Sequence, residues 1–172
     1  MDIPIQETTR LILRALKLED FEVYARMRAD PEVVRYISAP LSREDAWLKF
    51  LCGAGHWHVT GCGFWAVEEK ASGGYIGEAG YILRRREPAD PLAGAPEMGW
   101  VLAASAWGKG YASEAVRAAM KWGRVHFGPV RAICVVSPGN QASIRVAEKC
   151  GFKEILRDGE GDEARVVFDR VL

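Results

Sequence analysis

The stretch from Trp100 to Ala115 constrains the fold most, because it has the pattern of a strand, a glycine-rich turn and a helix. Gly108 and Gly110 lie in the turn, and the alanine-rich segment that follows has its apolar residues on one helical face. The first turn of a helix leaves backbone N–H groups unpaired, and the helix dipole adds positive charge there. The turn therefore predicts a phosphate site, although an ordinary strand-to-helix turn shares the pattern.

Two common phosphate-binding motifs do not match this turn. A Walker A loop needs glycine five positions before the Gly-Lys pair and Ser or Thr after it, whereas Ala103 and Gly110 occupy those places. A dinucleotide fingerprint needs a third glycine where Ser113 stands. The sequence thus argues against ATP bound by a Walker A loop and against NAD.

The rest of the chain alternates short apolar strands with helical segments, which predicts one α/β domain over residues 1–172. We expect the glycines at 53, 55, 61 and 63 to end the second helix, and residues 84–96 to form a mobile loop. Expected strands cover residues 10–14, 64–68, 75–83, 98–103, 131–136, 152–157 and 165–171. Expected helices cover 18–29, a segment from 42, 108–127 and 140–150.

Composition narrows the class of protein. The 23 basic and 23 acidic residues give a formal net charge of zero, so a nucleic-acid partner is not expected. No apolar run is long enough for a membrane span, and the N-terminus lacks a signal-peptide pattern. Four scattered cysteines do not suggest a disulfide framework, and His56, His58 and Cys62 lack the spacing of a zinc site. We expect a cytoplasmic protein without a metal.

A second motif, from Ser137 to Phe152, follows the next strand and places Asn140 after it. With the glycine turn it resembles the GNAT N-acetyltransferases, and in particular the branch of the ribosomal-protein alanine acetyltransferases. The resemblance covers essentially the whole chain, including residues 9–14, 30–33, 97–101 and 148–152. It implies a mixed, mostly antiparallel sheet flanked by helices, and acetyl-CoA as coenzyme.

The resemblance also implies which residues hold acetyl-CoA. The pyrophosphate would lie on the turn, where Trp107 replaces the family's Gln or Arg, and Asn140 matches an asparagine that contacts the pantetheine arm. An asparagine in that place is also a common helix cap. The implied coenzyme-binding residues are Val101, Leu102, Trp107, Gly108, Lys109, Gly110, Tyr111, Ala112, Ser113, Asn140 and Ser143.

The acid and base are less clear from the sequence. An ammonium group must lose a proton before it attacks a thioester, and Glu97 is the candidate base, with Glu78 as runner-up. Either carboxylate could instead face solvent or form an ion pair. Many family members have a proton-donating Tyr where this chain has Ala147, so Ser143 is the available hydroxyl. A serine on a helix face is more often structural.

The expected activity is transfer of acetyl to a primary amine by direct attack in a ternary complex. The acceptor would be the α-amine of a ribosomal or other protein, or a small-molecule amine. We expect His56 and Trp57 to border the acceptor pocket and 84–86 to form a solvated basic tip, with attraction of an acidic acceptor or ribosomal RNA as its alternative role. A homodimer is left open. The alternative function is a noncatalytic acyl-CoA-binding or sensing module, which the missing Tyr favours.

Overall fold

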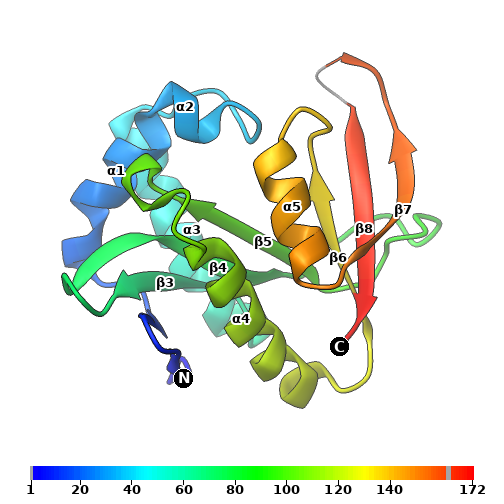
Figure 1. The fold of residues 1–172 in the computed structure, drawn as a ribbon, viewed down its shortest axis with the longest axis horizontal. Helices are drawn as coiled ribbons and strands as arrows, with labels where there is room; N and C mark the ends of the chain where they lie inside the picture. The colour runs from blue at the N-terminus through cyan, green and yellow to red at the C-terminus, as the bar shows by residue number, and fades with distance from the viewer. Residues whose placement is uncertain (1, 162–163) are drawn as a thin grey trace.

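The computed structural model describes residues 2–161 and 164–172, and its strands form one eight-stranded sheet (Figure 1). The strand order is β1-β2-β3-β4-β5-β6-β8-β7, and only β5 and β6 are parallel neighbours. The expected mixed, mostly antiparallel sheet is confirmed. The strands are β1 (Gln6–Glu7), β2 (Leu11–Arg14), β3 (Phe64–Glu69), β4 (Gly74–Ile82), β5 (Glu97–Leu102), β6 (Arg131–Val136), β7 (Lys153–Asp158) and β8 (Arg165–Val171).

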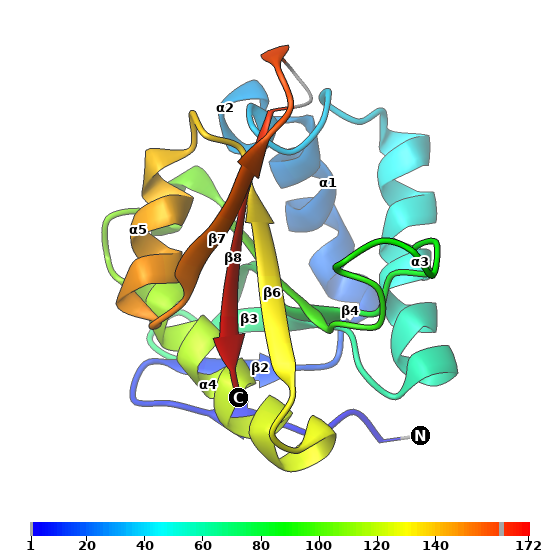
Figure 2. The ribbon, with the colours of Figure 1, turned by 90° about the vertical axis from the view of Figure 1, so that its right-hand side faces the viewer.

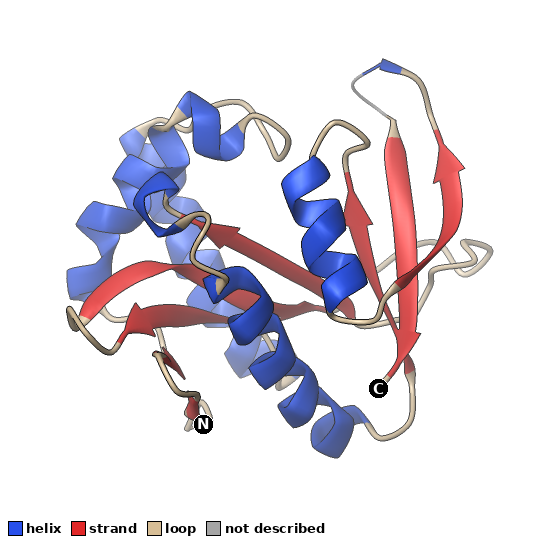
Figure 3. Cartoon of the chain, in the orientation of Figure 1, coloured by secondary structure: helices blue, strands red, loops and turns tan. Residues whose placement is uncertain are grey.

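Helices cover both faces of the sheet. Figure 2 shows α4 and α5 on one face and α1 and α3 on the other, and Figure 3 shows the same layers by type of structure. The β1 strand and the short α2 are elements that the sequence pattern did not predict. The helices are α1 (Phe21–Ala29), α2 (Pro31–Val34), α3 (Arg43–Thr60), α4 (Tyr111–Phe127) and α5 (Gln141–Lys149), with 3-10 turns η1 (Leu18–Asp20) and η2 (Ala104–Ala106).

The main core lies between α4 and the sheet. Small residues on the buried face of α4 let the helix come close, and a Cβ at Gly123 would overlap the Tyr81 side chain. Three tryptophans meet edge to face beside this helix: Trp57 with Trp65 at 4.7 Å and Trp65 with Trp122 at 5.0 Å between ring centroids. This packing fixes the long helix that begins at the glycine turn.

The expected end of the second helix was wrong. The helix α3 begins after its cap Ser42, as expected, but continues through Gly53 and Gly55 to Thr60 and ends at Gly61, which has φ 77°. Burial of Phe50 and Trp57 on opposite sides of these glycines outweighs their low helix propensity. Trp57 is 2% exposed, so it is a core residue and does not line an acceptor pocket.

The segment 84–96 is a loop, as expected, but it is anchored to the sheet. Leu92 is 2% exposed and packs in a small apolar cluster with Ile133 and Val167. Arg131 Nη1 donates to the Pro91 carbonyl at 3.4 Å. The loop therefore covers the part of β6 and β8 that α1 and α3 leave open.

No helix among the described residues has the length and apolar character needed to cross a membrane.

Candidate active site

The glycine turn has the backbone conformation that an anion site needs. Gly108 and Gly110 have φ of 73° and 79°, in the left-handed region, and Gly110 caps α4. A Cβ at Gly108 would meet no atom within 4 Å, and one at Gly110 would meet only Arg10 Nη2, at 3.5 Å. The backbone is thus open to a ligand, and the first N–H groups of α4 have no acceptor within the helix. These features fit a pyrophosphate group.

Arg10 braces this turn from the N-terminal part of the chain. Its Nη1 donates to the Lys109 carbonyl at 2.9 Å, and its Nε donates to Glu114 Oε2 at 2.7 Å. The guanidinium also lies over the Tyr111 ring, 4.6 Å from the centroid. The contacts join residues about a hundred positions apart, so local sequence patterns did not reveal this role of Arg10.

The remaining residues of the turn contribute in different ways. Lys109 is exposed, while Ser113 is 7% exposed and offers mainly its backbone. Trp107 is 47% exposed, and its indole Nε1 donates to the Leu102 carbonyl at 2.8 Å. Trp107 thereby links the turn to the end of β5. Trp107, at the position where the resemblance implied Gln or Arg, thus makes a structural contact.

The second feature is the gap between β5 and β6. The two strands pair in register only at Glu97 and Ile133, where the Ile133 N–H donates to the Pro96 carbonyl at 3.0 Å. Beyond this pair they diverge, as Figure 1 shows. The β5 edge that faces β6 therefore has backbone groups free for an extended ligand.

Backbone alternation identifies which residues of β5 face the gap. The Pro96 carbonyl accepts a hydrogen bond from β6, and the Ala103 N–H donates one to the Ile76 carbonyl of β4. Because consecutive residues alternate, Leu102 directs its main chain to the gap, whereas Val101 directs its own to β4. The expected main-chain role thus fits Leu102 and the gap-facing Trp100, and does not fit Val101.

Asn140 and Ser143 lie at the start of α5, on the other side of the gap. Asn140 Oδ1 accepts a hydrogen bond from the Ser143 N–H at 3.0 Å, so Asn140 is the cap of this helix. Among the residues that the structure describes, Nδ2 of Asn140 has no hydrogen-bond partner, so a cap role and a ligand contact are compatible. Ala147 is fully buried and packs in the core.

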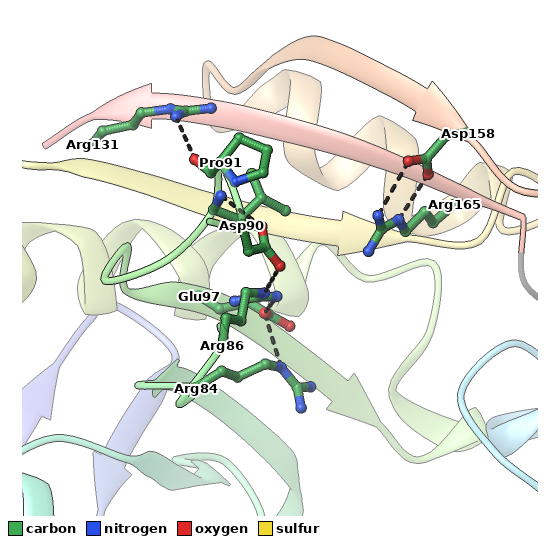
Figure 4. Close-up of polar contacts among 9 residues, drawn as sticks. Arg84, Arg86, Asp90, Pro91, Glu97, Arg131, Asp158 and Arg165 are labelled. Carbon is green, nitrogen blue, oxygen red and sulfur yellow. Dashed lines mark hydrogen bonds and ion pairs between the residues drawn. The ribbon is translucent and has the colours of Figure 1, made fainter. Parts of the chain in front are cut away.

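Glu97 begins β5 at the point where the two strands meet. With Val101 it projects to the face covered by α1 and α3, because side chains alternate and Val101 packs in the cluster of those helices. Its side chain is 12% exposed, and Oε2 accepts hydrogen bonds from Arg84 Nε at 2.9 Å and Arg86 Nη2 at 2.5 Å (Figure 4). The expected solvated basic tip is therefore wrong for Arg86, which is 13% exposed.

Glu78, the runner-up, lies in a different environment. Its side chain is 4% exposed and Oε2 accepts from Arg28 Nη2 at 2.6 Å. Burial raises the pKa of Glu78, and the charge of Arg28 opposes that rise. A carboxylate enclosed in this way has no direct access to an incoming amine. The structure thus favours Glu97 over Glu78 as the accessible carboxylate.

The histidine region has structural contacts. His56 Nδ1 lies 2.8 Å from the Cys62 carbonyl, beside the end of α3. Among residues 2–161 and 164–172, no three His, Cys, Asp or Glu side chains are grouped as metal ligands would be.

Comparison with known proteins agrees with this geometry. Residues 10–153 match the family model described as an acetyltransferase (GNAT) domain. An uncharacterized protein of Bacillus subtilis, YkkB, is 32% identical over 155 residues, which cover 84% of this chain and 83% of the relative. An acetyltransferase from Agrobacterium tumefaciens is 28% identical with a TM-score of 0.85, covering 100% of this chain and 96% of the other.

RimL, a ribosomal alpha-N-protein acetyltransferase solved in complex with coenzyme A, has the same fold. Its TM-score is 0.81 at 17% identity, and the match covers 98% of both chains.

Proposed function

The chain belongs to the GNAT acetyltransferase family and is an acetyl-CoA-dependent N-acetyltransferase, and on that premise we propose that it acetylates a primary amine by direct attack in a ternary complex. The observation that carries this proposal is the gap between β5 and β6. The two strands pair at one residue pair only. The glycine turn lies at one end of the gap, and Glu97 lies at the other. Family membership also favours an enzyme over a noncatalytic sensing module.

The turn and the two flanking elements would hold the coenzyme. Backbone N–H groups of residues 109–112 would bind the pyrophosphate. The main chain of Trp100 and the N–H of Leu102, on the free edge of β5, would bind the pantetheine arm, since the Leu102 carbonyl is already bonded to Trp107. Asn140 would add a side-chain contact from α5. The bound coenzyme supplies an activated acetyl group as a thioester. In this arrangement Trp107, Lys109, Tyr111 and Ser113 shape the turn.

Glu97 is the proposed base. Both of its cationic partners bind Oε2, and no hydrogen bond of Oε1 is present among the described residues. Oε1 can therefore accept a proton from the amine, directly or through water. Its face of the sheet is the one covered by α1 and α3, opposite α4 and α5. An acceptor approaching from that face would meet the coenzyme across the gap.

Ser143 is the proposed hydrogen-bond donor to the departing thiolate. It lies one turn into α5, where its backbone N–H is already used by Asn140 and its hydroxyl can rotate. The residue that commonly donates in relatives is replaced here by the buried Ala147. A serine is a weaker acid than tyrosine, so Ser143 would act mainly through a hydrogen bond.

The acceptor that makes the smallest demand on Glu97 is an α-amine. An α-amine with a pKa near 7.7 is about one-sixth neutral at pH 7, whereas a lysine amine near 10.4 is less than about 0.1% neutral. RimL, which shares the fold, acts on a ribosomal α-amine according to its description. We therefore rank a protein N-terminus first and small-molecule amines second.

The test is acetyl transfer measured as thiol release and as product mass. We would compare three acceptors: a peptide with a free α-amine and no lysine, the same peptide with a blocked α-amine and one lysine, and a linear diamine. The proposal predicts fastest turnover with the free α-amine and a strong loss in Glu97→Gln, with unchanged acetyl-CoA affinity. Turnover with the diamine alone would refute the protein acceptor, and equal turnover in Glu97→Gln would refute the base.

A further inference from the structure

A charged cluster joins the loop 84–96 to the first residue of β5. Arg86 Nη2 and Arg84 Nε both donate to Oε2 of Glu97, at 2.5 and 2.9 Å (Figure 4). Arg86 also forms an ion pair with Asp90, with Nε 3.5 Å from Oδ2. The guanidinium of Arg86 thus contacts two carboxylates, that of Asp90 in the same loop and that of Glu97 at the start of β5.

The two arginines differ in burial. The Arg86 side chain is 13% exposed and that of Glu97 is 12% exposed, whereas Arg84 is 54% exposed. An exposed ion pair is screened by water and holds its partner weakly. A largely buried, charge-assisted hydrogen bond orients its partner more strongly. Arg86 is therefore the partner that fixes the Glu97 side chain.

The loop that carries Arg86 is itself anchored. Leu92 is buried against Ile133 and Val167, and Arg131 holds the Pro91 carbonyl. A positioning group needs a rigid support, because its own motion would pass to the group that it holds. The anchored loop supplies that support to Arg86.

Both donors use the same oxygen of Glu97, and this leaves the other oxygen for chemistry. Among the described residues no hydrogen bond of the second oxygen is present, and no dashed line reaches it in Figure 4. Cys134 on β6 is a further titratable group near Glu97, and burial, followed by the charge of Glu97, raises the pKa of that thiol. A neutral thiol does not compete for the proton of an amine.

We propose that Arg86 is a positioning residue for acetyl transfer, which holds Oε2 of Glu97 so that Oε1 faces the acceptor amine. This inference rests on the proposed role of Glu97 as base. A carboxylate on a flexible side chain samples several rotamers, and proton transfer requires one of them. Arg86 selects that rotamer without contacting the substrate.

A double-mutant cycle on kcat tests the proposal. We expect Arg86→Met to lower kcat about tenfold by loosening the base, and Glu97→Gln to lower it about a hundredfold. The double variant should match Glu97→Gln, because Arg86 acts only through Glu97. Arg86→Lys should recover part of the loss. The matched control is Arg165→Met, which removes an exposed ion pair with Asp158 between β7 and β8, outside the loop (Figure 4), and should leave kcat within about twofold.

Three results would overturn the inference. Wild-type kcat in Arg86→Met would show that Glu97 needs no support, and losses that multiply in the double variant would show that Arg86 acts separately. In both cases the base role of Glu97 would stand. Wild-type kcat in Glu97→Gln would instead refute the base itself. If Arg86→Met does not unfold cooperatively, Arg86→Lys and Arg86→Gln complete the same cycle.

Discussion

Replacing Gly110 by alanine separates backbone strain from coenzyme binding. Gly110 has φ 79°, and its added Cβ would meet only Arg10 Nη2 at 3.5 Å, an ordinary contact. The folded protein should lose only the strain of a left-handed alanine, about 1 kcal/mol. The methyl group would, however, occupy the surface on which the pyrophosphate lies. Loss of one charge-assisted N–H bond of about 1.5–3 kcal/mol raises Kd about 10- to 150-fold.

Gly73 provides the matched control. It has φ 68° in the turn between β3 and β4, and a Cβ there would meet no atom within 4 Å. Gly73→Ala should therefore lose similar stability in urea unfolding but bind acetyl-CoA like the wild type in calorimetry. Wild-type affinity for acetyl-CoA in Gly110→Ala would refute the placement of the pyrophosphate. Equal weakening in both would show that general strain, and not the site, controls binding.

Other predictions concern the pairs and clusters that support the site. Arg28→Met should lower the free energy of unfolding in urea by about 3–5 kcal/mol, because the buried Glu78 loses its partner. The double variant Arg28→Met/Glu78→Met should recover most of that loss, and a small loss in Arg28→Met alone would contradict the pairing. Burial would raise the pKa of Glu114, but hydrogen bonds from Thr8 and Arg10 outweigh it and lower the pKa. A lowered folded-state pKa gives stability above the usual carboxyl range that is lost as pH falls, so Glu114→Gln should flatten the acid side of a Tm-against-pH curve; an unchanged curve would contradict this. Leu92→Ala should lower stability by about 2–3 kcal/mol and also lower kcat, because the loop that carries Arg86 loosens; normal kcat would separate the loop from catalysis.

Local patterns predicted much of this fold because the decisive signals are local. The β6 strand has the predicted bounds, and the glycine turn leads into α4 as expected, since positive φ and helix capping depend on neighbouring residues. The glycines inside α3 were misread because their effect depends on the burial of Phe50 and Trp57. That burial is a property of the packed sheet, and the helical pattern alone does not contain it.

The site was predicted less completely, because its supports come from distant segments. The position of Glu97 followed from its motif, but its partners Arg84 and Arg86 were assigned to solvent. A run of arginines on a proline-rich loop has no periodicity that would show where the loop returns. The hydrogen bonds from Arg10 to Glu114 likewise join segments that no local pattern connects.

The most direct test of the account is a crystal structure of the protein with coenzyme A. The account predicts the pyrophosphate on the backbone of residues 109–112 and the pantetheine arm along the free edge of β5. It places the sulfur atom of the coenzyme near Oε1 of Glu97. Coenzyme bound away from the turn, or a sulfur atom separated from Glu97 by a closed sheet, would contradict it.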